Sequence, residues 1–258
     1  MPRRATLVTM TRTQTPVAKH KPKVFVKGGR WDFVAMGLGL VVFATAAFTP
    51  SLVSPAHRIA PLTLLVSVHG LLFGAWVVLY LAQAVLIATG RRALHRRLGV
   101  ASIALVALMI VTGYETTIAL TRRGFDLSGD LHLRDPLMNA VFPLGDLFTF
   151  LILFGAGLWY RHRRAAHKRL MLLATLGMMM PATVTHFVGH NVPAMPVIVP
   201  LLLAILFITP AIYDRIRFGR FHPITLWGGI SLILWGNVRA VLIGPSADWK
   251  RFVTWLIS

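Results

Sequence analysis

Six polar residues stand inside apolar stretches of this sequence, and together they could do chemistry. They come from five different stretches and are His69, Glu115, Asp146, His186, His190 and Arg239. Ionisable side chains at membrane depth are costly and mark a functional site by default. When alternate stretches run in opposite directions, all six residues fall within about 12 Å of the same boundary at 1.5 Å per residue. The sequence therefore predicts one polar layer near the outer face of a membrane.

Metal binding is the function that this layer favours. His186 and His190 are spaced i, i+4 and therefore project from one helix face. That spacing suits two ligands of one metal ion, and His69 or Asp146 would supply a third ligand from a facing helix. Three nitrogen or oxygen ligands with an open fourth position are typical of catalytic zinc. We therefore expect a divalent metal ion, with zinc as the first choice.

The same layer is compatible with two functions other than metal binding. In the metal site Glu115 acts as general base and Arg239 as a charge partner. In a haem b or quinone-linked redox protein, His69 and His186 are axial ligands on facing helices. In a proton-coupled transporter, or in a structural protein without catalysis, the layer is a hydrogen-bonded network. That network pairs Glu115 with Arg239. It also pairs Asp146 with His69. Whether the chain is an enzyme stays open.

Long apolar runs are the elements that must position the layer. Of 258 residues 56% are hydrophobic and 14% are charged, which is too little charge for a soluble domain of this length. Seven runs approach the roughly 20 residues that span a hydrocarbon core; they are 33–48, 62–86, 100–120, 137–159, 170–188, 197–212 and 224–243. The sequence predicts an all-α polytopic bundle over 31–244, with one lead helix and three hairpins forming seven transmembrane helices.

The net charge of +19 is distributed as in a membrane protein rather than a nucleic-acid-binding protein. Lys and Arg number eight in 1–30, four in 91–97, five in 161–169 and three in 215–220. The intervening turns are poor in both, which is the positive-inside pattern. We expect the N-terminus in the cytoplasm, the C-terminus outside, and the basic loops against anionic lipid headgroups. The Thr-, Pro- and Lys-rich tail over 1–30 is expected to be disordered.

Two basic segments predict an internal repeat. Residues 91–98 read RRALHRRL and residues 163–170 read RRAAHKRL, 72 residues later. Each falls at the cytoplasmic bend of an expected hairpin, as in parallel repeats of transporters. His95, His167 and His222 at these bends are interpreted as interfacial residues with packing and lipid roles. Haem ligation at the cytoplasmic face is the alternative.

The end of the chain predicts a further, amphipathic helix. Ser246 has the character of an N-cap residue. Trp249, Phe252, Val253 and Leu256 follow at helical spacing, so we expect an interfacial helix over 245–258.

The stretch from His69 to Gly99 supports a resemblance. It contains Trp76 and Gln83 and ends in LHRRLG, and the later HKRLM at 167–171 adds to it. Together these motifs resemble a group of uncharacterised bacterial multi-pass inner-membrane proteins, over about half of the chain. The resemblance implies a bacterial cytoplasmic membrane and no activity. The polar layer is also similar in chemistry, though not in helix position, to the seven-helix zinc hydrolases of the alkaline ceramidase and adiponectin-receptor type.

Overall fold

A computed structural model describes residues 29, 31–55, 58, 61–125, 135–188 and 195–258 of the chain. Within these ranges it describes no side chain for 179–188, 195–196 and 199. The basic tail expected over 1–30 lies almost wholly outside the described residues.

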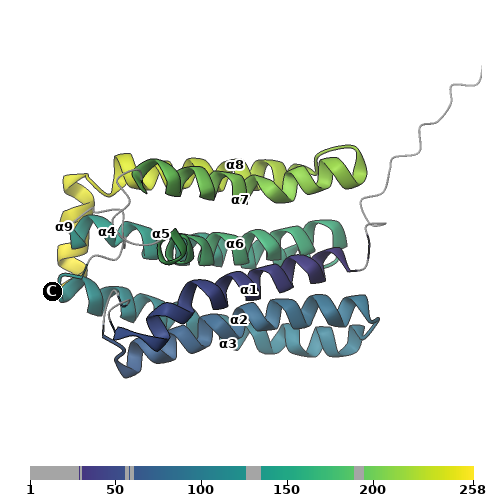
Figure 1. Cartoon of the computed structure of the whole chain (residues 1–258), viewed down its shortest axis with the longest axis horizontal. Helices are drawn as coiled ribbons and strands as arrows, with labels where there is room; N and C mark the ends of the chain where they lie inside the picture. Colours follow the sequence, from purple (N-terminus) through teal and green to yellow (C-terminus); the bar gives the residue numbers. More distant parts are fainter. Residues whose placement is uncertain (1–28, 30, 56–57, 59–60, 126–134, 189–194) are drawn as a thin grey trace, which may run out of the picture.

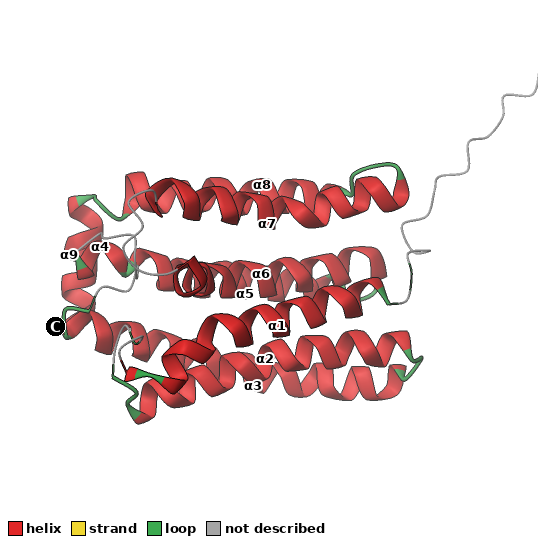
Figure 2. Cartoon of the chain, in the orientation of Figure 1, coloured by secondary structure: helices red, strands yellow, loops and turns green. Residues whose placement is uncertain are grey.

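The described chain is helical, as Figure 2 shows, and most helices run along one common direction. In chain order they are α1 (Asp32–Val53), α2 (Leu64–Ala88), α3 (Arg92–Arg122), α4 (Pro136–Asn139), α5 (Val141–Trp159), α6 (Arg164–Val188), α7 (Met195–Phe218), α8 (Pro223–Val238), the π-helical turn η3 (Arg239–Ile243) and α9 (Ala247–Ile257). Adjacent helices pack as hairpins, α2 with α3, α5 with α6 and α7 with α8, and α1 packs on α2 and α6. The expected all-α arrangement of a lead helix and three hairpins is thus confirmed.

The first two hairpins follow the predicted repeat. α3 begins at Arg92 and α6 at Arg164, which are 72 residues apart, like the two basic segments. α2 begins at Leu64 and the segment α4–α5 at Pro136, also 72 residues apart. The preceding residue of each, Thr63 and Asp135, caps the helix through its side chain.

The third hairpin repeats the second at a different interval. α7 extends over Met195–Phe218 and the segment α4–α5 over 136–159, so both ends are offset by 59 residues. α8 begins 59 residues after α6. The basic motif itself is not repeated, since Leu226 stands where the offset places His167. The ends of α7 and the start of α8 thus match this offset, whereas the basic motif with its histidine does not recur.

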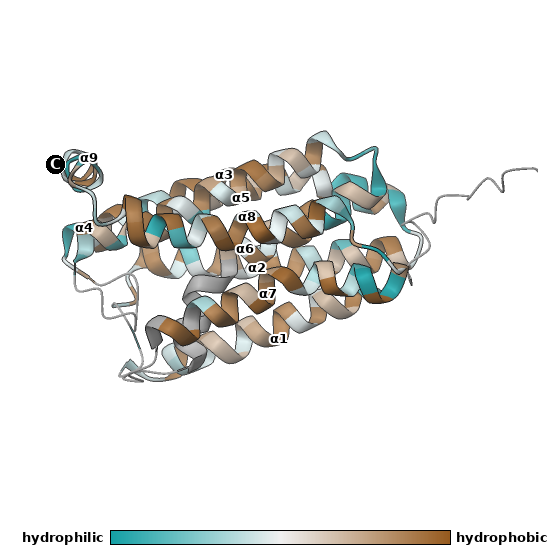
Figure 3. Ribbon diagram, turned by 90° about the horizontal axis from the view of Figure 1, so that it is seen from above, coloured by the Kyte–Doolittle hydropathy of each residue, from teal (hydrophilic) through white to brown (hydrophobic). Residues whose placement is uncertain are grey.

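Basic and apolar residues separate along the bundle. The bends of all three hairpins and the start of α1 lie at one end, and α9 lies at the other (Figure 1). Hydrophilic residues gather at the two ends and apolar ones along the middle (Figure 3). We call these the basic end and the α9 end. The described chain therefore starts and finishes at opposite ends of the bundle.

The number of helices that could cross a membrane differs from the expected seven. Five helices among the described residues are long and apolar enough: α1, α2, α3, the segment 136–159 and the segment 223–243. The runs over 170–188 and 197–212 are not among them, because parts of α6 and α7 lie outside the side chains that are described. By helix length and hydropathy the chain is a multi-pass membrane protein.

The core lies where α2, α5 and α6 meet. Trp76 packs edge-on against Phe150 and Phe154, with ring centres 5.0 and 5.6 Å away. Its indole N–H donates to the Thr175 hydroxyl across 3.2 Å, so a buried polar group finds a partner on α6. This contact fixes how the first hairpin faces the second.

The helix predicted near the C-terminus is present as α9. Ser246 caps it by accepting a hydrogen bond from the Trp249 N–H at 3.2 Å. α9 crosses the end of the bundle and is held by Lys250, 2.7 Å from Asp135, and by the Trp249 indole, which donates to the Leu137 carbonyl. Its position at a membrane interface stays a prediction.

Candidate functional site

The predicted polar layer contains one buried ion pair. Arg239 Nη1 lies 2.7 Å from Asp146 Oδ1 and also donates to the Phe142 carbonyl at 2.8 Å. Both charged residues are buried, at 6% and 9% exposure. Arg239 thus lies against a carboxylate, and its role as the charge partner of a functional site stays a prediction. Its carboxylate is Asp146 and not Glu115, because η3 turns the guanidinium toward α5.

A glycine makes room for this ion pair. A Cβ atom placed on Gly145 would lie 2.5 Å from both Cδ and Nη1 of Arg239. The arginine side chain therefore crosses the surface of α5 where the helix has no side chain. The guanidinium also lies over the Trp235 ring, 5.5 Å from its centre.

The other described members of the layer lie apart from this pair. Glu115 is exposed on α3. His69 is half-buried and stacks on Phe73 with ring centres 4.1 Å apart. Its Nδ1 is buried and has no hydrogen-bond partner among the described residues. The predicted pairing of Asp146 with His69 is therefore wrong, and so is that of Glu115 with Arg239.

The expected metal site gains no support from the described residues. Among them, three or more His, Asp or Glu side chains do not gather anywhere as a metal would require. Asp146 is engaged by Arg239 and is not a free ligand. His186 lies on α6 where side chains are not described, and His190 is outside the described residues. Their assignment as ligands stays a prediction.

The basic end brings together two histidines that the repeat relates. His95 on α3 and His167 on α6 are 72 residues apart in sequence, and each is the fourth residue after the start of its basic segment. Their ring centres are 6.3 Å apart and the ring planes are perpendicular, at 85°. Both side chains are half-buried. Equivalent positions of the two hairpins thus form one imidazole pair.

Each ring is held through its Nδ1 atom. His167 Nδ1 donates to the Gly157 carbonyl at 2.8 Å, which leaves Nε2 without the proton in the neutral ring. His95 Nδ1 lies 2.5 Å from the Gln83 side-chain amide. The hydrogen bonds of Gln83 are best satisfied when its oxygen accepts from the Gly99 N–H and its nitrogen donates to His95. Both rings are therefore oriented through Nδ1, where His167 donates, as ligating imidazoles do, and His95 accepts.

A second buried network lies at the same end. Arg169 on α6 forms a two-pronged ion pair with Asp214 on α7, with Nε 2.9 Å from Oδ2, and Nη1 donates to the Ala165 carbonyl. Thr225 on α8 donates to Asp214 at 2.6 Å. Arg169 and Asp214 are both fully buried. The network therefore joins the second and third hairpins.

His222 stands beside this network as the N-cap of α8. Its Nδ1 accepts a hydrogen bond from the Ile224 N–H at 3.2 Å. Burial, and after it the nearby positive charge of Arg169, lower the pKa of His222 to about 4. The ring is therefore neutral at ordinary pH, as the cap requires. The predicted packing role of His222 agrees with this geometry.

Sequence reasoning missed Asp214 and understated the histidine pair. Asp214 is an acid between an apolar run and a strongly basic bend, and this contrast was the available signal. The pairing of His95 with His167 needed the packing of α3 against the second hairpin, which the repeat alone does not specify.

No protein-family model matches this chain, and no curated protein or solved structure does either. The geometry of the basic end is therefore the basis for proposing a function.

Proposed function

We propose that this chain crosses the bacterial cytoplasmic membrane seven times, with its basic end in the cytoplasm. α6 and α7 contain 25 and 24 residues, so at 1.5 Å per residue each exceeds the roughly 30 Å of a hydrocarbon core. Both pack among the five helices that meet the length and hydropathy criteria. The concentration of Lys and Arg at one end supports the orientation.

The proposed activity is redox chemistry with a haem b group, which His95 and His167 would hold. The separation of the two rings carries this proposal. An imidazole nitrogen lies about 2 Å from the metal that it ligates, so two imidazoles on opposite sides of one metal have ring centres roughly 6 Å apart. The observed distance is 6.3 Å.

The ligand count favours haem over a bare metal ion. Structural and catalytic zinc sites take three or four protein ligands. Only two imidazoles meet here, and within the described residues no carboxylate or third histidine joins them as a metal cluster. Haem iron takes four ligands from the porphyrin and needs only two from the protein. The pair is therefore a complete ligand set for haem.

The surroundings supply what a haem needs at a membrane surface. Exposed arginines of both basic segments, among them Arg96 and Arg163, are available to pair with propionates. The Gly157 carbonyl accepts the Nδ1 proton of His167 and raises the basicity of its Nε2. Ligation through His95 Nε2 requires its Nδ1 to carry the proton, and the Gln83 amide can turn to accept it.

A proton relay through the same pair is the second candidate. The preferred orientation of the Gln83 amide favours this relay. In that orientation His95 carries its proton on Nε2, whereas Nε2 of His167 is free to accept a proton. The outer metal site stays a prediction, since it needs His186 and His190.

Absorption spectroscopy tests the haem proposal. The full chain, expressed in haem-sufficient cells and purified in detergent, should show a Soret band that shifts on reduction with dithionite. His95→Ala and His167→Ala should each lose most of the haem per polypeptide. His162→Ala is the matched control, because His162 is exposed at the same bend.

The spectra also separate the two candidates. Haem retained in both ligand variants contradicts the assigned ligands. A folded chain with no Soret band contradicts haem binding and leaves the relay, which predicts that His95→Gln and His167→Gln alter proton flux in liposomes while His162→Gln does not.

A further inference from the structure

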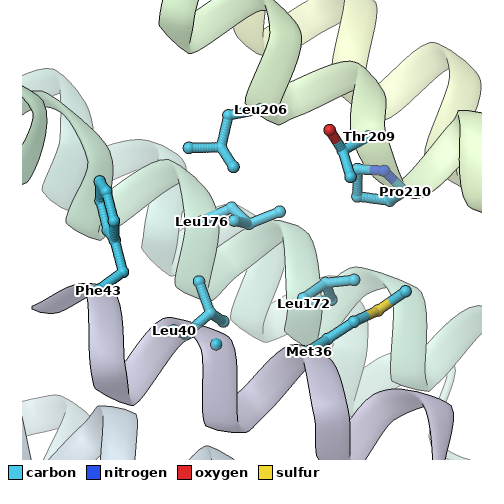
Figure 4. A pocket seen from close by; sticks show the side chains of 9 residues that line it. Met36, Leu40, Phe43, Leu172, Leu176, Leu206, Thr209 and Pro210 are labelled. Atoms are coloured by element: carbon cyan, nitrogen blue, oxygen red, sulfur yellow. The ribbon is translucent and has the colours of Figure 1, made fainter.

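A groove opens between α1 and α7, with α6 as its floor. α1 packs on α2 and α6, whereas α7 packs on α6 and α8, so the two outer helices leave space between them. The cavity has a volume of about 300 Å³, at the small end of the range for ligand pockets. Figure 4 shows Leu40, Leu176 and Leu206, one from each helix, pointing into it.

The groove is apolar along its length. The hydroxyl of Thr209, which faces the cavity in Figure 4, donates to the Ile205 carbonyl at 2.7 Å and so offers no free donor. The other lining residues are Leu, Met, Phe, Pro and Gly. Such a wall suits a hydrocarbon chain and has nothing to orient a polar ligand.

A clasp closes the groove toward the basic end. Asp32 on α1 accepts a hydrogen bond from the Tyr213 hydroxyl on α7 and lies 3.6 Å from Arg217 Nε. Phe33 packs edge-on against Tyr213, with ring centres 6.3 Å apart. A ligand therefore reaches the cavity sideways, from the lipid.

Lys168 supplies a positive charge at this clasp. It lies on α6 one turn before Leu172, which lines the cavity, and its Nζ is 4.4 Å from the centre of the Phe33 ring. The nearby carboxylates are engaged elsewhere, Asp32 by Tyr213 and Asp214 by Arg169. Lys168 forms no ion pair with any residue that the structure describes.

From this arrangement we infer a binding site for one anionic phospholipid of the cytoplasmic leaflet. One acyl chain lies in the groove between α1 and α7, and the phosphate pairs with Lys168. Charge complementarity selects this occupant, because an unpaired ammonium at an apolar groove favours an anionic headgroup. The site is separate from the histidine pair and does not depend on haem.

Native mass spectrometry of the detergent-purified chain tests this site. With phosphatidylglycerol and phosphatidylcholine added at equal concentration, one phosphatidylglycerol should be retained in preference. Lys168→Gln should weaken phosphatidylglycerol binding about fivefold, since one basic residue contributes about that factor. Phosphatidylcholine binding should change less, because its choline cation offsets the charge of the phosphate. Gly39→Leu should weaken both lipids, because Gly39 lines the cavity with nothing within 4 Å of its Cβ position.

Two matched controls make the result specific. Arg161→Gln removes an exposed charge at the same end, and Gly155→Leu fills open space on α5 away from the groove. Both should bind as the parent does. Equal retention of the two lipids by the parent overturns the proposal, as does full retention by Gly39→Leu. A loss in Arg161→Gln equal to that in Lys168→Gln shows a diffuse basic surface and also overturns it.

Discussion

At the scale of single residues, the chain holds its charges inside by pairing them. Arg169 and Asp146 are both buried, and each is satisfied by a partner on another helix. Removing one member of a buried pair leaves an uncompensated charge, which costs more than the pair contributes when intact. Substitutions at these residues are therefore expected to lower the stability of the fold, whatever their effect on function.

Replacing Arg169 by Leu should lower the stability of the protein sharply. The substitution leaves Asp214 buried without its guanidinium, at a cost of about 3–5 kcal/mol. Thermal unfolding in detergent measures the effect. Arg97→Leu is the control, because Arg97 is the equivalent residue of the repeat and is exposed; its unfolding temperature should stay near that of the parent. Similar losses in both variants would contradict the structural role of the network.

His222 should make the stability depend on pH. Its folded pKa is near 4, lowered by burial and by Arg169, Lys168 and Arg220, while Asp214 opposes the shift. The unfolded residue titrates near its usual value of about 6.5. As pH falls from there toward 4, only the unfolded chain takes up this proton, so stability decreases. His222→Asn keeps an N-cap and should remove this part of the dependence. If the dependence of stability on pH is the same in His222→Asn as in the parent, the predicted contribution of His222 is contradicted.

At the scale of elements, the hairpins are joined by contacts that depend on small residues. Gly145 lets Arg239 reach Asp146 across α5, and Gly229 on α8 would place a Cβ atom 2.5 Å from the Phe207 carbonyl of α7. These glycines set how closely two helices approach. Each glycine permits close contact only on the helix face where it lies.

Gly145→Ala should therefore destabilise the protein by about 1–3 kcal/mol, the usual cost of overpacking. The added methyl group displaces the Arg239 side chain from the Asp146 carboxylate. Gly155→Ala, on the same helix, meets nothing within 4 Å and should be neutral or slightly stabilising. Unfolding temperatures of the two variants give the comparison. If Gly145→Ala is as stable as Gly155→Ala, the close approach of Arg239 to Gly145 does not contribute to stability.

At the scale of the whole molecule, the three hairpins place their bends at one end. The Lys and Arg residues of the bends are therefore gathered at this end of the bundle, the asymmetry from which the orientation of a membrane protein is predicted. The start of α1 lies at the basic end and α9 at the other.

Reporter fusions test this orientation. Alkaline phosphatase should be active when fused after Ser258. Fused within the bend at 161–163 it should be inactive, whereas green fluorescent protein there should fluoresce. An active cytosolic reporter at Ser258, with the bends also cytosolic, requires an even number of crossings and would contradict seven passes.

The sequence by itself determined the class, the hairpins and their direction, because apolar runs and clustered Lys and Arg are local properties of the chain. It also specified the cap at Ser246 and the repeat that positions His95 and His167. Which polar side chains meet was decided only by the tertiary structure. Partners on different helices depend on helix rotation and crossing, and the η3 turn directs Arg239 to Asp146 rather than to Glu115. Residues at equal depth can face opposite sides of a bundle, so shared depth did not bring His69 or Glu115 to the Arg239–Asp146 pair.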